Sequence, residues 1–369
     1  MPDTVLTDAL PADLHYVDDT QPGITRKKLR GKFVYFEPSG QRITDPDEIK
    51  RINALAVPPA YTDVWICADP CGHLQATGRD ARGRKQYRYH ARWREVRDAD
   101  KYSRLRDFGL ALPKLRRQLE ALLDAPGFSR DKVMATVITL LDATLIRVGN
   151  TQYARDNRSY GLTTLRSRHV EVNGSAILFQ FRGKSGIEHQ ITVKDRRLAR
   201  IIKRCLEIPG QNLFQYLDEH GERHTVTSSD VNAYLQKLTG AAFTAKDYRT
   251  WAGSALALSV LRELQHESET EAKRHVVEAV KNVAKQLGNT PAVCRKCYIH
   301  PAVVEHFMLG ALAELPRPRV RKGLRAEEVA LAMFLERMCE VTEASRVART
   351  PCRSEPARDS GLSVDEYVD

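Results

Sequence analysis

Four side chains that lie far apart in the sequence could together support phosphoryl transfer to a protein hydroxyl without a metal: Arg147, Lys184, Arg249 and Tyr298. A phenol has an intrinsic pKa near 10, so a tyrosine nucleophile needs neighbouring positive charge and a phosphate whose oxygens are already neutralised. Guanidinium groups bind phosphate oxygens bidentately and never lose their charge. Two arginines, a lysine and a tyrosine therefore form a chemically sufficient set, provided that the fold brings them together.

Each of these residues also has an ordinary structural explanation. An arginine can cap the C-terminus of a helix or pair with a surface acid, and a lysine in a turn is usually solvated. Tyr298 could be a buried tyrosine on a helix face. The chemical interpretation thus depends on the four residues as an ordered set and on the elements that position them.

The charge of the chain favours a polyanionic partner. The formal net charge is +11 over 369 residues, with a pI near 9.3. Between Arg79 and Arg106 there are eleven Lys or Arg and four acids, a local net charge of +7, interleaved with Tyr87, Tyr89, Trp93 and Tyr102. This composition suits contacts with nucleic acid phosphates, and a solvated basic face is the alternative.

Other features of the sequence exclude some protein classes. No run of eighteen apolar residues is present, and acids and prolines interrupt the first thirty residues, so we expect no membrane association and no export. Seven scattered cysteines fit a reducing compartment, and we expect a cytoplasmic protein.

Cys294 and Cys297 allow a zinc or a redox interpretation. A structural zinc site would need a second pair of ligands, and Cys67 and Cys71 have a looser spacing in another part of the chain. We therefore expect no metal. Oxidation of the pair beside Tyr298 could still disturb the tyrosine, and inactivation by a thiol oxidant that persists in Cys297→Ser would exclude this hypothesis.

The N-terminal part of the chain has the pattern of a small β-rich domain. Strand-like runs occur at 33–37, 64–68 and 73–77, and a helix begins near Asp45 with a capping residue and an early proline. We expect a mobile segment over residues 1–25 and a DNA-binding β-rich domain over residues 26–98.

From about residue 99 the pattern becomes helical. Apolar residues at helical spacing from Val133 to Leu145 place Arg147 at the end of a buried helix. An Asn173-Gly174 turn predicts a hairpin, and a second turn carries Lys184 at its tip before a strand at 189–193. Further helices are expected at about 195–206 and 229–238.

Capping signals define the remaining helices. Thr244 and Asp247 resemble a capping box that opens a helix with Arg249 in its first turns. Another helix runs from about Ser268 to Leu287 and stops at Gly288, and Thr290-Pro291 starts a short helix that carries Tyr298. The fold class is thus α+β, with a catalytic domain over 99–315, mostly α-helical around a short antiparallel sheet. A C-terminal helix and disordered tail follow over 316–369.

These motifs, in this order, resemble type IB DNA topoisomerases of the compact poxvirus and bacterial kind. The resemblance covers about residues 26–315, and no one of its motifs would be specific alone. The matching segments are Gly78-Arg79-Asp80, Gly83 to Tyr87 with Tyr89, Ile146 to Asn150 with Tyr153, Phe181 to Ser185, Lys246 to Trp251 and Leu287 to Tyr298.

The resemblance implies a C-shaped clamp around duplex DNA and a defined reaction. Tyr298 attacks a backbone phosphorus to give a 3′-phosphotyrosyl bond and a free 5′-hydroxyl, and the strand is resealed after rotation. Arg147 and Arg249 are assigned to the phosphate. Lys184 is assigned as the general acid for the leaving 5′-oxygen, with assistance from Arg147. Neither ATP, a metal nor another cofactor is implied, and we expect a monomer without an obligatory protein partner.

Asn289 departs from the pattern of the family. Many members have a histidine nine residues before the tyrosine, whereas this chain has Asn289. Both side chains can donate a hydrogen bond to a phosphate oxygen, but only histidine can also carry charge or a proton. We therefore assign Asn289 a hydrogen-bonding role without acid or base function.

The resemblance also assigns residues that contact DNA. Glutamine and arginine can read base edges in the major groove, whereas a tyrosine hydroxyl more often contacts phosphate. The assigned residues are Arg79, Arg84, Gln86, Tyr87, Tyr89 and Tyr153.

Two other functions remain open at this level. A tyrosine recombinase has the same catalytic residue types, but its second arginine usually follows a histidine two or three residues earlier, where this chain has Lys246 and Asp247. Its N-terminal domain is also generally helical. A DNA-packaging protein would explain the charge but not the order of Lys184 and Tyr298. We expect a nucleoid-associated enzyme that acts on duplex DNA.

Overall fold

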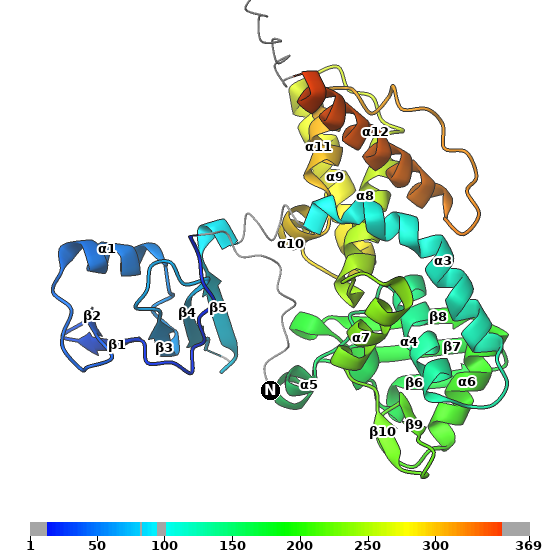
Figure 1. Cartoon of the computed structure of the whole chain (residues 1–369), viewed down its shortest axis with the longest axis horizontal. Helices are drawn as coiled ribbons and strands as arrows, with labels where there is room; N and C mark the ends of the chain where they lie inside the picture. Colours follow the sequence, from blue (N-terminus) through cyan, green and yellow to red (C-terminus); the bar gives the residue numbers. More distant parts are fainter. Residues whose placement is uncertain (1–12, 82, 94–100, 349–369) are drawn as a thin grey trace, which may run out of the picture.

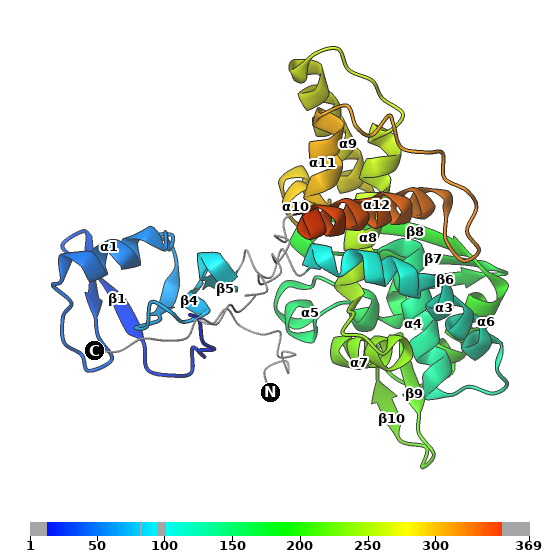
Figure 2. The same cartoon turned by 45° about the horizontal axis from the view of Figure 1, so that its top comes forward.

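The computed structural model describes residues 13–81, 83–93 and 101–348, with side chains up to residue 339. As predicted, the fold is α+β. An N-terminal antiparallel sheet is followed by a mostly helical body, and the two form separate lobes (Figures 1 and 2).

The N-terminal lobe is a five-stranded antiparallel sheet with the strand order β2-β1-β3-β4-β5. Helix α1 (Pro46–Ala54) begins at the predicted cap, Asp45, and its Ile52 packs into a small core with Ile24, Tyr35 and Ile66. The strands are β1 (Ile24–Leu29), β2 (Lys32–Phe36), β3 (Thr62–Ile66), β4 (Leu74–Arg79) and β5 (Lys85–Tyr89).

The chain joins this lobe earlier than expected. Ile24 already lies in β1, and Leu14 is buried. The Val17 N–H donates to His73 Nδ1 at 3.1 Å, and Thr77 Oγ1 donates to Asp19 at 2.9 Å. Residues 13–25 are therefore attached to the sheet, which corrects the expectation of a mobile segment there; residues 1–12 lie outside the described part.

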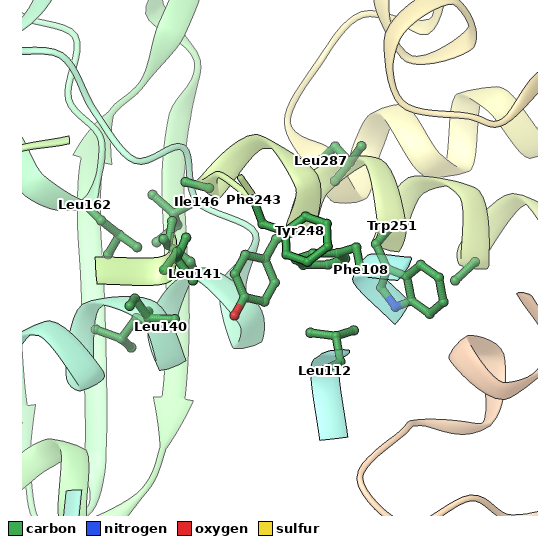
Figure 3. Packing of buried hydrophobic residues seen from close by; sticks show 14 of the residues in the cluster. Phe108, Leu112, Leu140, Leu141, Ile146, Leu162, Phe243, Tyr248, Trp251 and Leu287 are labelled. Carbon is green, nitrogen blue, oxygen red and sulfur yellow. The ribbon is translucent and has the colours of Figure 1, made fainter. Parts of the chain in front are cut away.

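The helical body is built around one large hydrophobic core. Phe108, Tyr248 and Trp251 meet at its centre with edge-to-face ring contacts, and Figure 3 shows them beside Leu112 and Phe243. The helices that surround this core are α3 (Leu105–Asp124), α4 (Arg130–Thr144), α5 (Thr151–Asn157), α6 (Arg196–Glu207), α7 (Ser228–Thr239), α8 (Ala245–Leu261), α9 (Glu269–Leu287), α10 (Pro291–Cys297), α11 (Pro301–Met308) and α12 (Ala326–Ala348).

The predicted hairpins are confirmed. Strands β6 (Val170–Asn173), β7 (Ala176–Arg182) and β8 (Glu188–Lys194) form an antiparallel sheet in chain order, and Asn173-Gly174 is the first turn. A second small pair, β9 (Gln215–Leu217) and β10 (Arg223–Thr225), was not predicted. The three-stranded sheet carries the turn that presents Lys184.

Helix α12 packs across α3 and α8 and contributes Leu331 and Phe334 to the same core as those helices. Arg116 on α3 bonds both Asp142 and Glu328 at 2.8 Å, which ties α3, α4 and α12 together. The described side chains of α12 thus belong to the core of the helical body. The domain boundary at residue 98 falls in 94–100 and the tail in 349–369, both outside the described residues. Within the described part, no helix combines the length and apolar character needed to cross a membrane.

Candidate active site

Arg147, Lys184, Arg249 and Tyr298 line one hollow of about 530 Å³. They come from four different elements that are up to 151 positions apart in the chain (298 − 147). Three further cations, Arg84, Arg182 and Lys246, line the same hollow, and no Asp or Glu is among the described residues around it. The fold thus gathers positive charge at this place, and of these cations Arg84 is paired with a carboxylate, that of Asp80, at 2.7 Å.

Arg147 lies beyond the helix on which it was expected. Helix α4 stops at Thr144 because Leu145 adopts a left-handed conformation (φ 55°), so Arg147 follows in a loop. Both of its terminal nitrogens, Nη1 and Nη2, donate to the Gly288 carbonyl at 3.3 Å. The carbonyl at the end of α9 therefore orients this guanidinium.

Arg249 is held more firmly. It lies in the second turn of α8, which opens with the predicted Thr244–Asp247 capping box, and only 4% of its surface is exposed. Its terminal nitrogens donate to the carbonyls of Leu145 and, at 2.7 Å, Leu287. Its Nε has no hydrogen-bond partner among the described residues.

The two arginines share a partly desolvated environment. Burial lowers the pKa of Arg147, and the positive charge of Arg249 lowers this pKa further. The Arg249 guanidinium carbon lies 5.1 Å from the centre of the Tyr298 ring. Such a pair attracts an anion strongly, because each positive charge is poorly solvated and unneutralised.

Lys184 lies at the tip of the β7–β8 hairpin, as predicted. It begins a 3₁₀ turn at Lys184–Gly186, and the Gly183 N–H donates to the Ile187 carbonyl at 2.7 Å across the loop. The side chain is exposed and makes no hydrogen bond or ion pair within the described part of the chain. It can therefore move toward a bound substrate.

Tyr298 follows the last residue of α10, and the backbone of α8 supports it. Its N–H donates to the Cys294 carbonyl at 2.9 Å, and its carbonyl accepts from Ser254 Oγ at 3.3 Å. A Cβ atom at Gly253 would lie 2.6 Å from the Tyr298 carbonyl oxygen. The absence of a side chain at Gly253 is thus what allows α8 to pack directly against the tyrosine.

Asn289 is not among the residues that line the hollow. Its Oδ1 accepts from the Thr290 N–H at 3.3 Å, and the residue directly follows Gly288, whose carbonyl holds Arg147. The hydrogen-bonding role assigned to it therefore stays a prediction.

His189 on β8 was not singled out from the sequence. Its ring stacks on Phe181 with centroids 4.9 Å apart, and it lies so close to Gly183 and Gly288 that a Cβ at either would clash with the ring. Burial and then the charges of Arg147 and Arg249 lower its pKa, which favours the neutral form of the ring. The alternation of side chains along a strand does not indicate from the sequence that this histidine packs beside the site.

Arg182 and Lys246 were also missed, although both lie within the motifs that carry the family resemblance. Arg182 precedes the turn of Lys184, and Lys246 is one helical turn before Thr250 on α8. Their positions inside these motifs were the only available signal.

The residues assigned to DNA contact separate into two groups. Arg84 and Tyr153 line the catalytic hollow, whereas Arg79, Gln86, Tyr87 and Tyr89 do not. Arg84 and Gln86 are both bound to Asp80, at 2.8 Å and 3.0 Å. The basic-stretch residues Arg82, Arg94 and Arg97 lie outside the described residues.

The two tyrosines of β5 form an aromatic surface. Tyr87 and Tyr89 are 47% and 39% exposed, and their rings lie nearly parallel with centroids 6.2 Å apart. Because side chains alternate along a strand, they project from the face of β5 opposite to that of Gln86.

The cysteine pair differs in accessibility. Cys294 is fully buried, which raises the pKa of its thiol, whereas Cys297 is partly exposed. Among the described residues, the one group of three side chains spaced to hold a metal ion is Asp218, Glu222 and His224, and it does not include these cysteines.

Two family models match the chain. The model described as eukaryotic DNA topoisomerase I, catalytic core, matches residues 90–311, and the model described as bacterial DNA topoisomerase IB, N-terminal domain, matches residues 32–80. The first match covers the whole catalytic hollow except Arg84.

Individual viral proteins are similar over most of their length. The DNA topoisomerase 1B of Acanthamoeba polyphaga mimivirus is 34% identical over 293 residues, which cover 77% of this chain and 87% of the relative. The DNA topoisomerase 1B of Vaccinia virus (strain Copenhagen) is 21% identical over 258 residues, or 68% of this chain and 79% of the relative. The DNA topoisomerase 1 of Rabbit fibroma virus (strain Kasza) is 23% identical over 262 residues, which cover 69% of this chain and 79% of the relative.

Proposed function

Because the chain belongs to the type IB DNA topoisomerase family and is thus a type I DNA topoisomerase, we propose that it relaxes positive and negative supercoils through a 3′-phosphotyrosyl intermediate. The observation that carries this proposal is the convergence of Arg147, Lys184, Arg249 and Tyr298 on one hollow, which the described residues line with cations and with no carboxylate.

The first step forms a bond between the Tyr298 oxygen and a backbone phosphorus, breaks the bond from phosphorus to the 5′-oxygen, and releases the phenolic proton of Tyr298 to solvent. Negative charge accumulates on the phosphate oxygens in the transition state, and Arg147 and Arg249 share it. Each guanidinium has five N–H donors, and the described structure uses two in each. The unpaired, buried Nε of Arg249 is a donor that a phosphate oxygen would satisfy.

Lys184 donates a proton to the departing 5′-oxygen, which would otherwise leave as a strongly basic alkoxide. Its exposed position on a turn leaves its ammonium group accessible to the substrate. After rotation of the duplex end, the 5′-hydroxyl attacks the phosphorus and returns a proton to Lys184. The bond from phosphorus to the Tyr298 oxygen breaks, and this oxygen takes up a proton from solvent. The phosphotyrosyl bond retains the energy of the broken bond, so the reaction consumes no ATP and requires no metal.

The two lobes would enclose duplex DNA as a C-shaped clamp, with one protomer sufficient. Tyr87 and Tyr89 on β5 and Tyr153 on α5 are exposed aromatic side chains available for DNA contacts, and Arg84 lies at the edge of the catalytic hollow. Asn289 adds a hydrogen bond to a phosphate oxygen. We place this activity in the cytoplasm, at the nucleoid.

Relaxation of plasmid DNA tests the proposal. The protein is incubated with negatively and with positively supercoiled plasmid in EDTA without ATP, in parallel with Tyr298→Phe. We expect the native protein to relax both substrates and Tyr298→Phe to bind but relax neither. Binding without relaxation by the native protein would contradict the proposal and favour a recombinase or a DNA-packaging protein.

A further inference from the structure

A second basic hollow, of about 590 Å³, lies on the other side of α5 from the catalytic hollow. Four arginines line it, Arg155, Arg158, Arg166 and Arg168, and we name it the arginine basin after them. None of the described residues around it is an Asp or a Glu. Five threonines add hydroxyl groups: Thr151, Thr163, Thr164, Thr225 and Thr227.

Helix α5 separates the two hollows and presents a different face to each. Tyr153 and Asn157 line the catalytic hollow, whereas Ala154, Arg155 and the following Arg158 line the arginine basin. Tyr160 lines both, so the two hollows are neighbours across one short helix. Figure 1 shows α5 at the edge of the helical body that faces the N-terminal lobe.

Within the described part of the chain, the arginines of the basin form no ion pair with a carboxylate. Arg155 and Arg158 are exposed and make no side-chain hydrogen bond or ion pair within the described part of the chain. Arg166 donates to Gln211, a neutral group, at 2.9 Å. Burial lowers the pKa of the neighbouring His169, and the charges of Arg168 and Arg166 lower it further, as expected in a positive potential.

The size of α5 relates the basin to the DNA. An α-helix with its side chains is about 10–12 Å across, and the major groove of B-form DNA is about 12 Å wide. A helix in that groove therefore has one phosphate backbone on each side. If α5 lies in the major groove and the scissile phosphate lies in the catalytic hollow, the backbone across the groove lies on the side of the arginine basin.

We propose that the arginine basin binds backbone phosphates of the same duplex, across α5 from the scissile phosphate. This inference rests on the proposed function, because it takes the scissile phosphate as the reference point. Guanidinium and hydroxyl donors without carboxylates are suited to phosphodiester oxygens and carry no base specificity. The basin would then fix the duplex on α5 while Tyr298 reacts.

The test combines a charge change in the protein with a charge change in the DNA. A double variant, Arg158→Gln with Arg168→Gln, removes the cation that directly follows α5 and one from the 3₁₀ turn at Ser167–His169. Arg200→Gln is the matched control, because Arg200 is an exposed arginine of α6 that lines neither hollow. All three proteins carry Tyr298→Phe, so binding is measured independently of catalysis, and circular dichroism confirms folding.

Affinity for a duplex is measured against salt concentration. Each lost phosphate contact reduces the steepness of the plot of log association constant against log salt concentration by about 0.9. We therefore expect a reduction of roughly 2 for the double variant and no reduction for Arg200→Gln. Equal slopes in the two variants would overturn the proposal.

Neutral methylphosphonates placed one at a time in either strand then locate the contact. We expect the protein with an intact basin to lose affinity at phosphates across the major groove from the cleavage site, and the double variant to be insensitive there. Loss at the scissile phosphate alone would overturn the proposal. The proposal would also be overturned if the double variant kept its affinity for a single duplex and lost only the ability to bridge two duplexes. The basin would then bind a second DNA molecule. Failure of plasmid relaxation by the native protein, in contrast, would concern only the proposed function.

Discussion

The cations around the catalytic hollow differ in how firmly the protein holds them. Arg147 and Arg249 are both bonded to main-chain carbonyls at the end of α9, at Gly288 and Leu287. Lys184 makes no such bond within the described residues. This difference matches the roles proposed for the three residues. Arg147 and Arg249 stabilise charge in the transition state, which benefits from preorganised groups, whereas Lys184 must approach the leaving oxygen to deliver a proton.

This division predicts a selective rescue of Lys184→Ala. Loss of a general acid should slow cleavage by about 10²- to 10⁴-fold on a normal phosphodiester. A substrate with a 5′-bridging sulfur should restore the rate, because a thiolate leaves without a proton. Single-turnover cleavage of both substrates measures the effect. Lys246→Ala is the control: it removes another cation from the same hollow and should show no preference for the sulfur substrate. Equal slowing of Lys184→Ala on both substrates would exclude the general-acid role.

A second prediction at the residue scale concerns His300, two positions after Tyr298. Burial lowers its pKa to about 4, and Lys101 and His306 add repulsion to the protonated form. Because the folded-state pKa lies below the ordinary value of about 6.5, the unfolded chain binds this proton more readily. Stability should therefore fall as the pH is lowered from about 6.5 to 4, by up to about 3 kcal/mol from this residue.

His300→Asn isolates this contribution. His300 Nδ1 accepts from the Ala302 N–H at the start of α11, and asparagine can provide the same cap without titrating. Urea unfolding at pH 7 and pH 4 should show a smaller loss of stability in the variant. An identical loss in both proteins would show that His300 does not titrate in this window.

At the scale of elements, α8 is the support on which the site is assembled. It carries Arg249 in its second turn and contacts the Tyr298 backbone one turn later through Gly253 and Ser254. Helix α9 ends beside it and supplies the carbonyls that orient both arginines. The spacing of phosphate-binding groups and nucleophile is thus set by the packing of two helices.

This arrangement predicts the effect of Gly253→Ala. The new Cβ would lie 2.6 Å from the Tyr298 carbonyl oxygen, a backbone atom, so the tyrosine must shift. A displacement of this size can reduce a reaction rate by about 10²-fold. We expect slower single-turnover cleavage with little change in DNA affinity. Ser259→Ala on the same helix is the control and should cleave normally; a normal rate for Gly253→Ala would contradict the support role of α8.

Local chemistry made many of these elements predictable. The caps at Thr244 and Ser268, the left-handed stop at Gly288 and the Asn173-Gly174 turn are short-range signals, and the structure confirms them. The predicted end of α4 was wrong, because nothing in the sequence indicates that Leu145 would adopt a left-handed conformation. Strands β1 and β5 were missed because their cations disrupt the usual strand composition.

At the scale of the whole molecule, the ordered motifs predicted which residues meet in the site. The spacing of these residues did not predict which contacts hold them there. Arg147 and Gly288 are 141 positions apart, and their bond depends on the packing of α9 beside the loop after α4. The arginine basin was not predicted, because its four arginines lie in or beside α5 and the 3₁₀ turn at Ser167–His169 and look like ordinary surface cations in the sequence. Long-range packing of this kind leaves no local pattern to read.

The covalent intermediate provides the most direct test of the central claim, that Tyr298 becomes linked to the 3′ end of a nicked strand. The protein is mixed with a duplex, denatured during cleavage, and the adduct is mapped by peptide mass spectrometry with label on either side of the nick. We predict that the strand fragment upstream of the nick stays attached to the peptide that contains Tyr298 and that the downstream fragment carries a free 5′-hydroxyl. Attachment to another residue, or through a 5′-phosphate, would contradict the account.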